Sequence, residues 1–173
     1  MHVPLSEILA EGDMRTTGRS AEVVEVVLDS PERLHELMMG MEAPDPGVRM
    51  RSSDALEKVT AIHPEWLVPM KDQLLRISRA ATQQEVQWHC AQLLSRLPVS
   101  AQEAGQIAEI LEGYLNLKSA IVKACAIEAL AHLALKFPER KDSTQAMILL
   151  QMVDGTAAVV ARCKRALKLL SRA

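Results

Sequence analysis

Aromatic residues and glycine are both scarce in this chain. Only 2% of its 173 residues are aromatic, and seven are glycine. Most β-proteins need more of both, because strands favour aromatic side chains and turns favour glycine. Alanine, leucine, methionine and valine are abundant instead, and apolar residues make up 49% of the chain. This is the composition of a folded globular protein, and it favours an all-helical fold packed with small and aliphatic side chains.

Paired cysteines, a leader sequence and long apolar runs are also missing. Cys90, Cys125 and Cys163 are 35 and 38 residues apart and form no CxxC pair, which favours free thiols in a reducing compartment. Residues 1–14 hold three acids and no Lys or Arg, so they do not resemble a secretory signal. No uncharged apolar run approaches the ~18–20 residues of a membrane span. We therefore expect a cytoplasmic protein without a membrane segment.

A large excess of positive charge is absent, since the formal net charge is −2. This argues against a protein that coats nucleic acid over its whole surface. The charge is uneven, at −7 over residues 1–47 and +5 over residues 48–173. A basic stretch at the C-terminus could bind phosphate, or it could be the polar end of a helical stack. Its residues are Arg162, Lys164, Arg165, Lys168 and Arg172.

Four nine-residue segments align without gaps, and their first valines are 38, 36 and 37 residues apart. The apolar positions that they share fall within about 100° of arc on a helix, so each segment predicts a helix with one buried stripe. A small residue in the middle of each stripe would let a neighbouring helix approach closely. The segments are Val48–Leu56, Val86–Leu94, Val122–Leu130 and Val159–Leu167, and the small residues are Ser52, Cys90, Ala126 and Cys163.

A second set of helices is expected between these segments, so that each unit is a helix, a tight turn and a second helix. Pro69 should kink or delay the first helix of its unit. Residues 1–30 are expected to form a capping segment, in which Ser20 is a candidate N-cap. We expect one domain, with helical repeats over residues 31–173 in units of about 31–62, 64–98, 100–137 and 141–172.

Two stretches resemble the HEAT repeat. Leu67-Val-Pro-Met-Lys-Asp-Gln-Leu-Leu75 is similar to the first helix of that repeat, with its internal proline, and Asp45-Pro-Gly-Val48-Arg49 is similar to the turn before the second helix. Gln87, Lys123 and Val160 stand in the arginine position of the later units. The resemblance covers residues 31–171, and the whole chain resembles short stand-alone bacterial HEAT-like proteins. It implies a right-handed α-α superhelix, an armadillo-like solenoid whose second helices line a concave face.

Catalytic motifs are not evident. The sequence has no GxSxG, no phosphate-binding glycine loop and no GxGxxG. His35-Glu36 begins an HExxH pattern, but Met39 stands where the second zinc ligand should be. We therefore expect no metal, no cofactor and no enzymatic activity.

The positions opposite the apolar stripes suggest a binding surface for a protein or peptide of mixed charge. Trp88 could anchor such a partner, or it could pack against the neighbouring second helix. The alternative function is nucleic-acid binding or DNA repair, because the fold is similar to that of HEAT-like alkylpurine DNA glycosylases, for which Trp88, Asp54, Arg51 and Arg96 are the candidate residues. The full candidate surface is Trp88, His89, Arg51, Asp54, Gln92, Arg96, Glu128 and His132.

Overall fold

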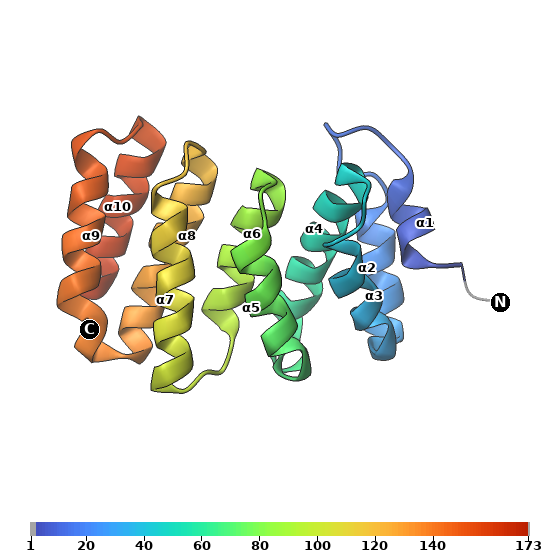
Figure 1. Cartoon of the computed structure of the whole chain (residues 1–173), viewed down its shortest axis with the longest axis horizontal. Coiled ribbons are helices and arrows are strands. Elements are labelled where there is room, and N and C mark those ends of the chain that lie inside the picture. The colour runs from blue at the N-terminus through green and yellow to red at the C-terminus, as the bar shows by residue number, and fades with distance from the viewer. Residues whose placement is uncertain (1–2, 173) are drawn as a thin grey trace. The chain divides into compact units, whose positions relative to one another are not determined.

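The computed structural model describes residues 3–172, and every regular element in that range is a helix (Figure 1). The all-helical prediction is therefore confirmed. The elements are α1 (Leu5–Ala10), α2 (Ser20–Asp29), η1 (Pro31–Arg33), α3 (Leu34–Gly40), α4 (Pro46–Ile62), η2 (Pro64–Met70), α5 (Lys71–Ala80), α6 (Gln84–Arg96), α7 (Ala101–Leu115), α8 (Ala120–Lys136), η3 (Pro138–Arg140), α9 (Lys141–Val153) and α10 (Ala157–Leu170).

The chain forms two compact units, one up to Leu93 and one from Leu94 onward. In the first unit α1, α2 and α3 all pack against α4. In the second unit α8 packs against α7, α9 and α10, and α9 packs against α10. The boundary between the units falls inside α6.

The four aligned segments are all helical, as predicted. They lie in α4, α6, α8 and α10, and their leading valines are all buried. The small residues of the stripes, Ser52, Cys90, Ala126 and Cys163, are completely buried as well. The buried side chains of these helices therefore follow the sequence stripe.

Prolines and capping side chains account for where several helices begin. Pro69 lies in the 3₁₀ segment η2, and the α-helix begins only at Lys71. Proline has no N–H group to continue an α-helical hydrogen-bond pattern, so this delay was expected. Asp45 caps α4 by accepting a hydrogen bond of 2.8 Å from the Val48 amide. Ser100 and Glu103 form a reciprocal capping box at the start of α7.

The N-terminal segment contains two helices and a connecting loop. α1 and α2 pack against α4, and residues 11–19 between them are exposed. Ser20 is not the N-cap of α2, because the helix begins at Ser20 itself and Arg19 occupies the cap position. The Ser20 hydroxyl instead donates a hydrogen bond of 2.5 Å to the Asp54 carboxylate on α4. The side chain that was expected to cap the start of α2 therefore links α2 to α4.

Candidate functional site

Arg51 was expected on an exposed surface, and the structure corrects this. Its side chain is only 1% exposed and lies beneath the N-terminal loop. The guanidinium donates hydrogen bonds to the backbone carbonyls of Leu9 (2.8 Å), Thr16 (3.4 Å) and Asp13. Arginine is rarely buried this deeply unless its N–H groups find acceptors. Arg51 therefore holds the loop against α4 and presents no group to a partner.

Glycines surround the Arg51 side chain because the loop passes very close to it. Gly12 and Gly18 have positive φ angles of 103° and 51°, a region that favours glycine. A Cβ atom at Gly18 would lie 3.0 Å from Arg51 Nε, and one at Gly47 would lie 2.7 Å from Arg51 Nη1. These positions leave no room for a side chain, so the glycines and the arginine form one structural unit.

Asp54, another expected binding residue, is also mostly buried. Its Oδ2 atom accepts hydrogen bonds from Ser20 Oγ at 2.5 Å and from Lys58 Nζ at 2.7 Å. Only 9% of the residue is exposed. Asp54 therefore joins α2 to α4 and orients Lys58, whose own side chain extends to the surface. The prediction that Asp54 faces a partner directly is wrong in this respect.

His89 is buried beside these groups. Its Nδ1 atom lies 3.1 Å from Gln92 Oε1. Burial lowers the pKa of His89 because the interior disfavours the imidazolium, and Lys58 acts in the same direction. The carboxylates of Asp54 and Glu57 partly oppose this effect. The lowered pKa favours the neutral imidazole at pH 7. His89 is therefore a buried polar group of α6 that lies near the charged side chains of α4.

Trp88 is neither fully buried nor fully exposed. Its ring lies 5.5 Å from the His89 ring, centroid to centroid, at an interplanar angle of 55°. Gln92, one turn further along α6, is partly exposed in the same way, and so is Glu57 on α4. Lys58 is exposed. We call Glu57, Lys58, Trp88 and Gln92 the α4/α6 surface; it carries both signs of charge and one indole.

The remaining expected residues belong to the second unit. Glu128 is exposed and forms an ion pair with Arg162. His132 is partly buried, and burial followed by the charge of Lys136 lowers its pKa. Lys136 donates a hydrogen bond of 2.9 Å to the Ser95 carbonyl. Arg96 is partly buried. Within this unit a small cavity of about 70 Å³ lies beside the Glu128–Arg162 pair.

A larger cleft, which the sequence did not suggest, lies in the first unit where two turns approach each other. It has a volume of about 320 Å³. One turn joins α3 to α4, and the other joins α5 to α6. The lining residues are Met41, Glu42, Arg49, Ile77, Ala80, Ala81, Thr82, Gln83 and Val86. The signal that could have indicated it is the alignment of the valine segments. That alignment places each turn at the same distance before its aligned segment.

Neither a metal site nor a membrane-spanning helix is present in the described part of the chain. Residues 3–172 contain no group of three or more His, Cys, Asp and Glu side chains arranged to hold a metal ion. Over the same residues, no helix combines the length and the apolar character needed to cross a bilayer. Comparison with known proteins finds no family model that matches the chain and no curated protein that matches its sequence.

Proposed function

We propose that the protein is a non-enzymatic interaction module that binds a peptide segment of another protein. The observation that carries the proposal is the partly exposed Trp88 indole on the mixed-charge α4/α6 surface. Partly exposed tryptophans contribute disproportionately to protein interfaces, because a large apolar area is buried when a partner covers them. Glu57 and Lys58, whose charges act on the neighbouring His89, offer charges of both signs to a peptide.

The groups beneath this surface support a rigid binding face. Asp54 fixes Lys58 through a hydrogen bond of 2.7 Å, and His89 lies between Trp88 and Gln92 in sequence and contacts both side chains. A side chain that is already oriented loses less conformational entropy on binding. The α4/α6 surface is therefore suited to recognition with little rearrangement.

The HEAT-like solenoid is part of the same proposal. If the four helix pairs stack as a right-handed superhelix, the second helices line one groove, and Arg96, Glu128 and His132 extend the binding surface along it. The all-helical fold and the buried stripes of α4, α6, α8 and α10 are consistent with this arrangement.

The experiment uses peptides selected from a random displayed library against the immobilised protein. The affinity of an enriched peptide is then measured for the unaltered protein and for Trp88→Ala. We expect a loss of about 2 kcal/mol, or roughly thirtyfold in Kd. Trp66→Ala is the matched control, because Trp66 is also partly exposed but lies in η2, where it stacks on His63 with centroids 4.2 Å apart. The control should bind normally.

A thermal melt of Trp88→Ala decides between the two interpretations of this residue. An anchor for a partner can be removed with little effect on folding. A packed indole cannot, and its loss should lower the free energy of unfolding by about 3 kcal/mol or more. A large fall in melting temperature, or equal peptide binding by Trp88→Ala, would contradict the proposal.

Nucleic-acid binding is the second candidate, and the exposed cations of α10 and the C-terminus favour it. Lys164, Arg165, Lys168 and Arg172 are all exposed. Arg51 and Asp54, which the resemblance to DNA glycosylases would employ, are engaged in the packing of the N-terminal segment. A mobility-shift assay with duplex DNA at low salt tests this candidate, because phosphate contacts are strongest there. A shift that Lys164→Ala and Lys168→Ala together abolish would support it over peptide binding.

A further inference from the structure

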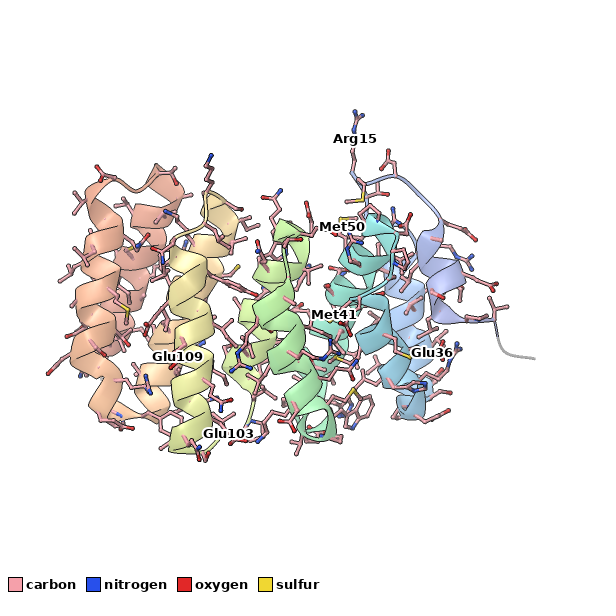
Figure 2. All side chains as sticks on the ribbon, in the orientation of Figure 1. Arg15, Glu36, Met41, Met50, Glu103 and Glu109 are labelled. Carbon is pink, nitrogen blue, oxygen red and sulfur yellow. The ribbon has the colours of Figure 1, made fainter. Side chains whose placement is uncertain are left out.

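The cleft between the two turns of the first unit has an apolar floor and a polar rim. Met41, Ile77 and Val86 contribute the floor, and each is almost completely buried. Met41, labelled in Figure 2, lies beside α5. Arg49, Thr82 and Gln83 contribute polar groups to the lining. A cavity of about 320 Å³ is at the small end of the range for ligand sites, roughly 300–1,000 Å³.

Arg49 brings a positive charge to this cleft that its hydrogen-bond partners do not neutralise. Its Nη1 atom donates to the carbonyls of Ala43 and Pro44, each at 2.8 Å, and its Nε atom donates to Gln83 Oε1 at 2.8 Å. All three acceptors are neutral. The side chain is thus held firmly, while the full charge of the guanidinium remains available.

The repeat alignment shows why the charge is not neutralised. Val48 and Val86 are equivalent positions, 38 residues apart, so Gln83 is the position equivalent to Asp45, and each lies three residues before its aligned segment. An acid at position 83 would form an ion pair with Arg49. The amide accepts the same hydrogen bond without the negative charge.

Glu42 also lines the cleft, but another cation neutralises it. Arg76 donates two hydrogen bonds to its two carboxylate oxygens, one of 2.8 Å from Nη2 and one of 2.5 Å from Nη1. The Arg76 guanidinium is the main reason that the pKa of Glu42 lies below its usual range. Because Glu42 and Arg76 cancel each other, the local charge of the cleft is that of Arg49.

We propose that this cleft binds a carboxylate carried on a short aliphatic group, such as the C-terminal residue of a peptide or a small branched acid. Arg49 binds the carboxylate, and the aliphatic group packs on Met41, Ile77 and Val86. Arginine suits this role because its guanidinium is always charged, and the three hydrogen bonds of Arg49 leave Nη2 to donate to the carboxylate. The proposal does not depend on the α4/α6 surface, because none of Glu57, Lys58, Trp88 and Gln92 lines the cleft.

The test uses N-acetyl-L-leucine and N-acetyl-L-leucinamide as probes, with binding followed by amide chemical shifts in ¹⁵N-labelled protein. The two probes share their aliphatic group and differ in charge. We expect the acid to shift the amides of Met41, Ala81, Thr82 and Gln83 and to bind at least tenfold more tightly than the amide probe. Equal binding of the two probes, or no binding of either, would overturn the proposal.

Gln83→Glu tests the charge argument with the least change in shape. The new carboxylate should pair with Arg49 and weaken binding of N-acetyl-L-leucine at least tenfold. Gln84→Glu is the matched control, because it adds the same charge one residue away, on an exposed side chain outside the lining. Unchanged affinity in Gln83→Glu would overturn the proposal. If that variant does not fold, the affinities of N-acetyl-L-leucine and N-acetyl-L-leucinamide for the unaltered protein still test the proposal.

Two further probes distinguish the source of the carboxylate. Gly-Ser-Gly-Leu with a free C-terminus presents it on a peptide, and 4-methylpentanoate presents it on a free acid. Tighter binding of the peptide assigns the site to protein C-termini, and tighter binding of the free acid assigns it to a small metabolite. Trp88→Ala should leave the affinity for every probe unchanged, so a failure of the peptide-binding proposal would not affect this test.

Discussion

A Cβ atom placed on Gly40 would lie 2.1 Å from the hydroxyl oxygen of Ser52 and 2.8 Å from its Cβ. Gly40 ends α3, and Ser52 is the small residue in the stripe of α4, so α3 and α4 approach each other closely at this contact. We expect Gly40→Ala to lower the free energy of unfolding by about 1–3 kcal/mol, as overpacking does. Urea titration measures the change.

Gly113→Ala is the matched control for that substitution. Gly113 lies in α7, is exposed, and has nothing within 4 Å of an added Cβ. Alanine there should stabilise the helix by about 0.5–1 kcal/mol. Opposite signs for the two substitutions are the expected result, and equal effects would contradict the close approach of α3 and α4.

Ser52→Ala should not destabilise the protein. The Ser52 hydroxyl is buried and makes no hydrogen bond. An unsatisfied buried polar group costs about 1–3 kcal/mol, so removing it should raise the free energy of unfolding. Ser53→Ala is the comparison, because the Ser53 hydroxyl donates to the Arg49 carbonyl at 2.8 Å. A clear loss of stability in Ser52→Ala would show that the hydroxyl has a partner.

Arg51→Met should release the N-terminal loop. The substitution removes three hydrogen bonds to loop and α1 carbonyls, and we expect a loss of roughly 2–4 kcal/mol in stability. Arg15, which extends from the loop in Figure 2, is a site for trypsin, and its cleavage should become faster. Arg33→Met is the comparison. It removes the hydrogen bond from Arg33 to the Val3 carbonyl, and Arg33 is less buried than Arg51. Unchanged proteolysis at Arg15 would contradict the role given to Arg51.

Stability should fall as the pH is lowered from 7.5 to 5, and His89 should contribute to this. Burial keeps its pKa in the folded protein below the value of about 6.5 in the unfolded chain. Below pH 6.5 the unfolded chain therefore binds more protons, which favours unfolding. His89→Gln should reduce the slope of unfolding free energy against pH. His35→Gln, at an exposed position, is the control and should leave the slope unchanged.

The three thiols should differ in reactivity. Cys90 and Cys163 are completely buried, whereas Cys125 is partly exposed, and none forms a disulfide. Burial also raises the pKa of Cys163, which lowers the fraction of reactive thiolate. A coloured disulfide reagent should therefore label Cys125 quickly and the other two slowly in the folded protein. Fast labelling of Cys90 and Cys163 would show that the stripe positions are wrong.

The sequence predicted the helices well because helix formation depends on local pattern. The valine stripes predicted the buried faces of their helices, and Pro69 predicted the late start of α5. Both depend on residues close by in the sequence, and the structure agrees with both. The position of Arg51 was predicted wrongly for the opposite reason. A helical wheel shows which side of α4 a residue occupies, but the segment that covers that side begins some 40 residues earlier. The burial of Asp54 has the same origin, since its partner Ser20 is 34 residues away.

The cleft at Arg49 depends on contacts of similar range, because Arg49 and Gln83 are 34 residues apart. Nothing in either turn alone indicates a cavity, which arises only when the turns of two successive pairs are packed together.

The burial of Arg51 also limits how this chain can be shortened or rebuilt. A chain that began at Pro31 would keep the arginine and lose all three of its carbonyl acceptors. Copying the Val48–Leu56 segment into an additional helix would place a second arginine with no loop to supply its acceptors. The N-terminal segment and Arg51 must therefore be kept or replaced together, because the loop supplies the acceptors that the buried guanidinium needs.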